Sequence, residues 1–367
     1  MAGDSTRTLV EQFRKLAGSQ YSFDYQIEYQ SEGDAAWRMI ADPEAGADIY
    51  FFPQDQLNRL VRAGALSELS EDAASYVTTY NDGGSALAAT YDDAYYAFPA
   101  TADNGYFMYY DASFFKDVDM TDLDAIYAKC KEGGRTIYFE YGNAWYNSAF
   151  FMGYGAHCLY EVDKDGHFLD VDDTYDSEAG YEAARAMARY FTDKFVFING
   201  SSASAFTDGA AVVISGIWDY STALSILGDN LGATKLPRVR SRDGGELVQL
   251  ASFCGNKLVG TKPQKNKTRS ELVESLAAYL TSEEAQRMRF EQTGWGPSNV
   301  NLQQDPDVAN SPALSALFAQ NEFAKPLGEF SGSWWSIAGN IGTEIANGID
   351  PETAVATYKE GLPATLW

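Results

Sequence analysis

Apolar residues recur at helical and strand spacings along the first part of the chain. Residues 5–16 place apolar side chains on one helical face and predict an amphipathic helix. The alternating residues 21–29 and the apolar run 47–52 predict strands. Helices are expected around 35–40 and over 54–63. This alternation is typical of an α/β unit with a largely parallel sheet.

Residues 205–227 combine a strand, a turn and a helix start. The apolar, β-branched run 210–214 stops at a Ser-Gly turn, which Trp218, Asp219 and Tyr220 follow. Open α/β sheets bind ligands at the carboxyl ends of their strands, so Trp218 is interpreted as a ligand-stacking residue, with core packing as the alternative. The two interpretations are equally supported for Tyr220, and Asp219 either binds a hydroxyl group or caps the helix.

The rest of the pattern predicts further helices and one surface hairpin. A turn at 163–166 inside residues 158–169 predicts the hairpin. A calcium loop is the alternative there, but its ligand spacing and terminal Glu are absent. Helices are expected at 71–90, 111–117, 121–132, 177–194, 268–281, 282–292, 312–321, 333–346 and 351–359. The chain of 367 residues exceeds one typical domain, and no linker divides it, so it is expected to cross between two domains more than once.

Composition excludes several classes of function. There are 27 Lys and Arg residues against 52 Asp and Glu, a formal charge of -25, which argues against binding to nucleic acid or to anionic membrane surfaces. The carboxylates are scattered and predict a solvated surface. Three separated cysteines and two histidines predict neither a disulfide framework nor a metal site, and no cofactor is expected. The sequence contains no apolar run of about 18 residues, which is the length that a membrane-spanning helix needs.

Five segments resemble a known family in the family's own order. They are 46–69 (GADIYFFPQDQLNRLVRAGALSEL), 96–115, 205–220, 252–263 and 333–348. They resemble the bacterial extracellular solute-binding proteins of the maltose/maltodextrin type. These proteins are the ligand-capturing subunits of ABC importers, and the resemblance covers nearly the whole chain.

The resemblance implies a two-lobed α/β fold of the type II periplasmic-binding-protein class. Each lobe is expected to hold a mostly parallel sheet flanked by helices, with a hinge of crossovers near 102–105, 251–256 and 296–301. Family members begin with a strand before the first helix, so the signal, any lipid-bearing cysteine and that strand are expected to be absent from this sequence, leaving an unpaired sheet edge. The lobes implied are 1–102 with 256–298, and 103–255 with 299–367.

A site for an oligosaccharide needs aromatic platforms and groups that donate and accept hydrogen bonds. The aromatic candidates are Trp218, Tyr220, Trp334, Trp335, Trp145, Tyr146 and Phe52. The hydroxyl-binding candidates are Asp55, Gln56, Asp103, Asn104, Asn143, Asp219 and Asp34.

Several candidates carry a structural alternative. Asp55 starts a helix, where capping is as well supported as ligand binding, and Gln56 stands where the family pattern has Arg. Asp103 takes a position that usually bears a carboxylate in the family. Of the adjacent Trp334 and Trp335 at a helix start, one is expected to face the ligand and the other to pack. Ligand binding is favoured over core packing for Trp145 and Tyr146, whereas Trp37 is expected to be buried on its helix.

The resemblance implies a non-enzymatic sugar-binding subunit that captures maltodextrin or a related oligosaccharide in an interlobe cleft and closes on it by a hinge motion. Its implied partners are ABC permease membrane subunits, and the protein is expected to be an extracellular monomer, either periplasmic or a cell-surface lipoprotein. Two alternatives stay open. One is a carbohydrate hydrolase that uses paired carboxylates such as Asp55 and Asp103. The other is a binder of a non-sugar solute such as a peptide or polyamine.

Overall fold

The computed structural model describes residues 2–163 and 166–366, and the chain forms two compact α/β units. Unit 1 contains the residues up to Asn104 together with Gly255–Ser311; unit 2 contains Gly105–Cys254 and the residues from Pro312 onward. The boundaries expected from the sequence put residues 299–311 in the second lobe, whereas the structure groups them with unit 1. The reason is local: Asn299 forms a β-bridge with Asn81, and Gln303 donates to Asp82 at 3.0 Å.

Unit 1 is built on a three-stranded sheet. Its strands are β1 (Ile49–Pro53), β15 (Lys257–Thr261) and β4 (Ala97–Thr101), in the order β1-β15-β4. β15 runs antiparallel to both neighbours, so the sheet is antiparallel rather than mostly parallel, and β1 and β4 run in the same direction on either side of β15. The carboxyl ends of β1 and β4 therefore lie at the same end of the sheet, on either side of Lys257.

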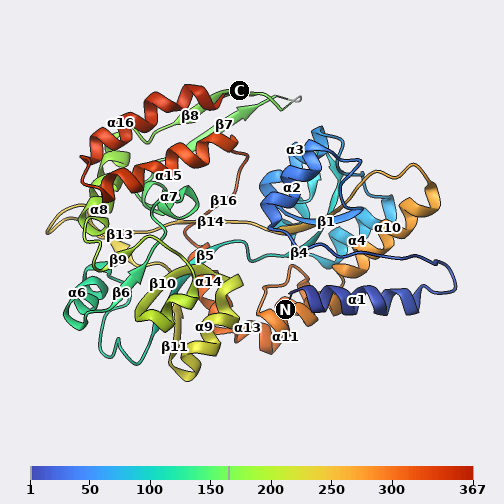
Figure 1. Ribbon diagram of the computed structural model, residues 1–367, viewed down its shortest axis with the longest axis horizontal. Coiled ribbons are helices and arrows are strands. Elements are labelled where there is room, and N and C mark those ends of the chain that lie inside the picture. The colour runs from blue at the N-terminus through green and yellow to red at the C-terminus, as the bar shows by residue number, and fades with distance from the viewer. Residues whose placement is uncertain (1, 164–165, 367) are drawn as a thin grey trace. The chain divides into compact units, whose positions relative to one another are not determined.

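Helices cover both faces of the unit 1 sheet (Figure 1). Tyr50 and Phe52 point into one apolar cluster with Leu57 and Leu60, while Phe51 borders another that contains Val77 and other apolar residues. Helix α1 (Ala2–Leu16) packs against α10 (Lys267–Leu280) and α11 (Glu283–Thr293). The other elements are α2 (Glu32–Ala41), α3 (Leu57–Arg62), α4 (Glu71–Tyr80), α5 (Gly83–Leu87), β2 (Thr90–Tyr91), β3 (Ala94–Tyr95), α12 (Val300–Gln303) and α13 (Pro306–Ala309).

Residues 21–29 and Trp37 also differ from what the sequence predicts for unit 1. Residues 21–29 form no strand: they run outside regular secondary structure, although their burial alternates as in a strand and Phe23 packs against Phe13 at 6.2 Å. Among the described strands β1 pairs with β15 alone. Trp37 is 48% exposed instead of buried, because its ring packs under the Arg59 guanidinium at 4.3 Å and not into the core.

Unit 2 is built on a five-stranded mixed sheet. The strand order is β11 (Leu231–Thr234), β5 (Tyr106–Asp111), β10 (Ala210–Gly216), β6 (Thr136–Tyr138) and β9 (Phe197–Ile198). β10 pairs antiparallel with β5 and parallel with β6, so only part of the sheet has the expected parallel arrangement. All seven residues of β10 are buried, which explains their continuous apolar run.

Helices and a hairpin complete unit 2. Helices α7 (Ala144–Gly153), α8 (Glu178–Phe191), α15 (Gly332–Ala346) and α16 (Pro351–Gly361) pack around its largest apolar core. The hairpin expected at 158–169 is confirmed by the pairing of β7 (Cys158–Val162) with β8 (Phe168–Asp173); residues 164 and 165 of its turn lie outside the described residues. The other elements are α6 (Leu123–Gly133), α9 (Tyr220–Leu227), α14 (Pro312–Asn321), β12 (Arg238–Val239), β13 (Val248–Gln249), β14 (Ser252–Cys254) and β16 (Ala324–Pro326).

Gly342 permits a close approach of α15 to the backbone of Tyr141. A Cβ atom at Gly342 would lie 1.8 Å from the Tyr141 carbonyl oxygen. Moving either backbone apart costs free energy. We therefore expect Gly342→Ala to lower the free energy of unfolding by about 1–3 kcal/mol, measured by urea unfolding. Gly361→Ala is the control, because the nearest atom to its Cβ would be 3.6 Å away and no loss is expected. Equal losses for both variants would contradict this account.

Candidate functional site

Two half-buried tryptophans of unit 2 pack on one buried phenylalanine. Trp145 stacks on Phe253 with ring centroids 5.3 Å apart and an interplanar angle of 25°. Trp335 meets the same ring edge-on at 6.1 Å. Phe253 is only 4% exposed, while both tryptophans keep part of their surface in solvent. We call Trp145, Trp335 and Phe253 the tryptophan face.

Each tryptophan of this face lies in the first turn of a helix. Asn143 caps α7, with its side-chain oxygen accepting the Trp145 N–H at 3.0 Å, so this candidate acts as a cap. Trp335 lies in the first turn of α15, which follows Ser331. Because both side chains leave from first turns, their orientations are fixed by backbone that is itself anchored.

Trp334 packs and Trp335 remains accessible, which resolves the alternative for this pair. Trp334 is fully buried and donates its indole N–H to the Tyr358 hydroxyl at 3.1 Å. Tyr358 donates in turn to Asp173 at 2.7 Å. Burial raises the pKa of Asp173, although Tyr358 and Lys359 oppose that shift. This chain of hydrogen bonds locks the buried ring that lies 4.9 Å from Trp335.

Trp218 lies over a glycine at the end of β10. A Cβ atom on Gly216 would lie 2.2 Å from Cζ3 of Trp218, so the ring covers the bare backbone there. Gly216 pairs with Tyr106, whose ring lies 5.5 Å from Trp145. Trp218 itself is half-buried against the unit 2 core, so both of its predicted roles retain support.

Trp218→Ala is expected to weaken sugar binding by about 1–3 kcal/mol, since stacking and apolar burial are both lost. Isothermal titration calorimetry with maltotriose measures the change. Leu224→Ala in the following helix α9, at a side chain that is 43% exposed, provides a control with unchanged affinity. Unchanged affinity of the Trp218 variant would remove this residue from the site.

The neighbours of Trp218 have structural roles that the sequence did not reveal. The Asp219 side chain makes no capping hydrogen bond to α9. Its carboxylate accepts hydrogen bonds from the Ser215 hydroxyl at 2.7 Å and from the Ala203 N–H at 3.1 Å. Tyr146 is 4% exposed, and burial raises its pKa. Its predicted role as a stacking platform is therefore wrong in this structure, because the ring packs on Tyr106 at 5.0 Å. Tyr220 is half-buried and stays a candidate.

In unit 1, polar residues gather at the carboxyl ends of β1 and β4. Gln54 and Asn256 exchange two hydrogen bonds: the Asn256 N–H donates to the Gln54 side chain at 2.9 Å, and the Gln54 N–H donates to the Asn256 carbonyl at 3.1 Å. The half-buried Asn104 donates its N–H to the Gly255 carbonyl at 3.0 Å. Asp103 is 1% exposed and accepts the Gly296 N–H at 2.6 Å. This carboxylate therefore holds a backbone turn of unit 1.

The other candidates of unit 1 are Asp55, Phe52 and Asp34, and they differ in how far their side chains are buried. Asp55 does not cap a helix: the short helix at Gln54–Gln56 and α3 both lack a side-chain cap, and Gln56 donates to the Asp55 carboxylate at 2.5 Å. Phe52 is fully buried in the core of unit 1, so in this structure it exposes no surface to a ligand. Asp34 is exposed in the first turn of α2, where it accepts the Ser31 hydroxyl at 2.6 Å.

Sequence reasoning missed Phe253, Trp295 and Lys257. Trp295 is half-buried at the same edge of unit 1, and the buried Lys257 ammonium lies 4.1 Å from its ring centroid. No local pattern marks such a pair, because the two residues are distant in sequence. The Gly-Trp-Gly motif at 294–296 was the available signal, since glycines on both sides of an aromatic residue indicate a constrained turn.

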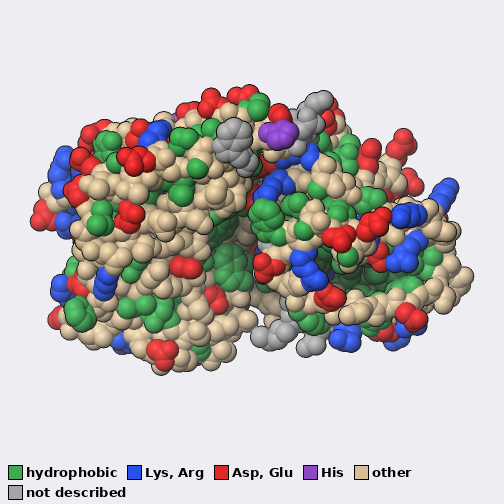
Figure 2. All heavy atoms as spheres, turned by 45° about the horizontal axis from the view of Figure 1, so that its top comes forward, with side chains coloured by type: hydrophobic (Ala, Val, Ile, Leu, Met, Phe, Trp, Pro, Cys, Tyr) green, Lys and Arg blue, Asp and Glu red, His purple; other side chains and the backbone are tan. Residues whose placement is uncertain are grey.

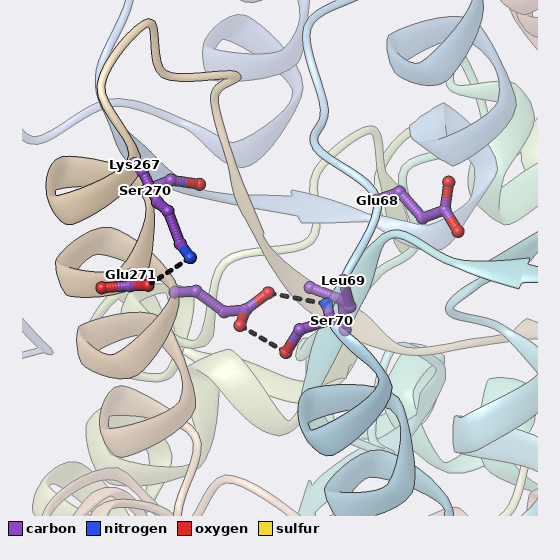
Figure 3. Close-up of a pocket in the computed structure, with 7 residues that line it drawn as sticks. Glu68, Leu69, Ser70, Lys267, Ser270 and Glu271 are labelled. Atoms are coloured by element: carbon purple, nitrogen blue, oxygen red, sulfur yellow. Dashed lines mark hydrogen bonds and ion pairs between the residues drawn. The ribbon is translucent and has the colours of Figure 1, made fainter.

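A hollow at the surface of unit 1 offers no comparable chemistry. Its volume is about 370 Å³, and it is lined by Glu68, Ser70, Lys267, Glu274 and neighbouring residues, with no aromatic ring among them. Figure 3 shows Lys267 reaching toward Glu271 while Glu68 points away. Among the described residues, no cluster of His, Cys, Asp and Glu could hold a metal ion.

Acidic side chains are dispersed over the face of the molecule shown in Figure 2 instead of forming one patch. This agrees with the solvated acidic surface expected from the sequence. In the described part of the chain, no helix combines the length and the apolar character that crossing a membrane requires. All three cysteines are free thiols.

The chain passes between two α/β units more than once, and unit 2 presents partly exposed aromatic rings. This is the architecture of solute-binding proteins. Residues 8–316 match the model of the bacterial extracellular solute-binding protein family. The chain belongs to this family. It is 27% identical over 337 residues to a galactooligosaccharide-binding protein of Bacillus subtilis (strain 168), a match that covers 87% of this chain and 76% of that protein.

Solved structures confirm the two-lobed type II fold. A structure with acarbose is 29% identical, covers 100% of this chain and 94% of its own, and superposes with a TM-score of 0.84. The maltodextrin-binding protein of L. casei BL23, solved without ligand, is 20% identical, with coverages of 98% and 94% and a TM-score of 0.79.

Proposed function

We propose that this protein is the extracellular binding subunit of an ABC importer and captures a neutral oligosaccharide on its tryptophan face. The observation that carries the proposal is the pair Trp145 and Trp335, both half-buried and both packed on Phe253. Flat, partly exposed indole rings on a rigid base match the apolar faces of sugar rings. The relatives named for galactooligosaccharide and in complex with acarbose support this ligand class.

The free energy of binding requires several contacts to act together. A net hydrogen bond supplies only about 0.5–1.5 kcal/mol, whereas a micromolar Kd needs about -8.2 kcal/mol. Stacking on two tryptophans therefore has to be supplemented by hydroxyl contacts. Contributions from both lobes, hinge closure and recognition of the closed form by a membrane permease stay predictions from the family resemblance, as do the monomeric state and a lipid anchor.

A thermal-shift screen tests the ligand class. The probes are maltotriose, β-1,4-galactotriose, spermidine and tetraglycine. A ligand at about 100 times its Kd adds about 2.7 kcal/mol to the stability of the folded protein, which raises the melting temperature by several degrees. We expect a shift with at least one of the sugars. A shift with spermidine or tetraglycine alone would replace the sugar proposal by the non-sugar alternative.

We also propose that binding occurs without hydrolysis. The hydrolase alternative pairs Asp55 with Asp103, but Asp103 is 1% exposed and accepts the Gly296 N–H, so in this structure it is engaged with the backbone. Incubation with maltotetraose should release no new reducing ends. Sustained release that is lost in Asp55→Asn would establish an enzyme instead.

A further inference from the structure

Trp295 stands out from a buried turn of unit 1. Among residues 293–299 it is the one that is not buried. On one side Gly294, with φ 78°, ends α11 in the left-handed conformation. On the other side Gly296 donates its N–H to Asp103 at 2.6 Å, and its carbonyl accepts the Ala102 N–H at 3.0 Å. The backbone on both sides is anchored, as a rigid binding platform requires.

A buried cation holds the indole ring from beneath. Lys257 is 4% exposed, and its Nζ lies 4.1 Å from the centroid of the Trp295 ring. A cation at this distance fixes the orientation of the ring through its attraction to the π-electrons. The same attraction draws electron density toward Lys257, so the opposite face of the ring attracts a second cation less strongly. The free face is thereby biased toward neutral ligands.

The location of Trp295 also fits a binding role. Lys257 lies opposite Pro53 and Thr101, the last residues of β1 and β4. β1 and β4 run in the same direction on either side of the antiparallel β15, so their carboxyl ends lie at one end of the sheet, and open α/β sheets bind ligands outside the carboxyl ends of their strands. Gln54 follows β1 directly and Asn104 lies three residues after the end of β4, and both side chains are half-buried.

We propose that Trp295, oriented by Lys257, is an aromatic subsite of unit 1 that stacks on the face of a neutral sugar ring and disfavours cationic solutes. This inference rests on the proposed function and adds a residue that determines its specificity. The competing account is structural, in which Trp295 only shields the Lys257 ammonium from water.

Isothermal titration calorimetry with maltotriose and with β-1,4-galactotriose tests the subsite in Trp295→Ala, Trp295→Phe and wild type. For the sugar that wild type binds, Trp295→Ala should lower affinity about 5- to 100-fold, and Trp295→Phe should restore most of it because a flat ring remains. Trp37→Ala is a matched control: Trp37 is also in unit 1 and also lies against a cation, Arg59 at 4.3 Å, yet it is placed on helix α2. Its affinity should equal that of wild type. Unchanged affinity in a folded Trp295→Ala would overturn the proposal.

A second measurement does not depend on the folding of the alanine variant. The fluorescence difference between wild type and Trp295→Phe belongs to Trp295, and bound sugar should protect that component from quenching by acrylamide. Equal quenching with and without sugar would overturn the subsite. Trp335→Ala is titrated in parallel: if it loses affinity while Trp295→Ala does not, only this inference fails, whereas a wild type that binds neither sugar overturns the proposed function itself.

Discussion

Phe253→Ala is expected to lower both the stability of unit 2 and its affinity for sugar. Phe253 is 4% exposed and contacts Trp145, Trp335 and Phe330, the last at 5.7 Å. Truncation removes a buried ring and leaves a cavity, which typically costs about 3–5 kcal/mol of unfolding free energy. The two tryptophans then lose their common base, so the stacking surface is no longer preorganised.

Urea unfolding and calorimetry with the bound sugar separate the two effects. The control is Phe195→Ala, at a side chain of unit 2 that is 93% exposed, where a change within about 0.5 kcal/mol is expected. Affinity is compared at a temperature where circular dichroism shows the variant to be folded. A Phe253 variant that is destabilised but binds sugar as wild type does would show that the tryptophan face is not the binding surface.

The sequence was most informative where one periodic pattern determines one element. The helical periodicity of 177–194, 312–321 and 333–346 predicted α8, α14 and α15 to within a few residues. The run 210–214 predicted β10, although the strand continues through the expected Ser-Gly turn to Gly216, and Trp218 lies just after the strand end. In these segments local propensity and burial agree, so no distant contact was needed to decide the structure.

The sequence was least informative where burial depends on partners distant along the chain. Residues 21–29 have strand alternation, but a strand also needs a hydrogen-bonded neighbour, which local spacing cannot supply. Trp37 was assigned to the core by residue type, although an exposed indole is stabilised here by Arg59. Adjacent tryptophans illustrate the same limit, since only the contact of Trp334 with Tyr358 decides which ring is buried.

The candidate site shows this limit most clearly for its carboxylates. Asp103 and Asp219 were interpreted as hydroxyl-binding groups because of their positions, yet each holds backbone N–H groups of its own unit. A buried N–H left unsatisfied costs free energy, so a carboxylate near a tight turn is readily recruited to it. Trp145 and Trp335, in contrast, were proposed from residue type together with a place after a strand end for Trp145 and at a helix start for Trp335, and the structure brings both to Phe253.

Replacing Trp145 and Trp335 together is expected to bring sugar binding close to the detection limit of calorimetry. Each single alanine variant should cost about 1–3 kcal/mol of binding free energy, and each tenfold loss in affinity corresponds to about 1.4 kcal/mol. Because both rings pack on Phe253, losing one loosens the other, and the double variant should lose less than the sum of the two single variants.

The double-mutant cycle therefore measures coupling through Phe253 as well as affinity. Wild type, both single variants and the double variant are titrated with the same sugar, and the melting temperature of each is recorded. Strict additivity would show that the rings contribute independently and that Phe253 does not couple them. A double variant with wild-type affinity would place the sugar elsewhere on the protein. The interaction free energy of the cycle thus tests whether preorganisation on one buried ring makes these two tryptophans a single binding surface.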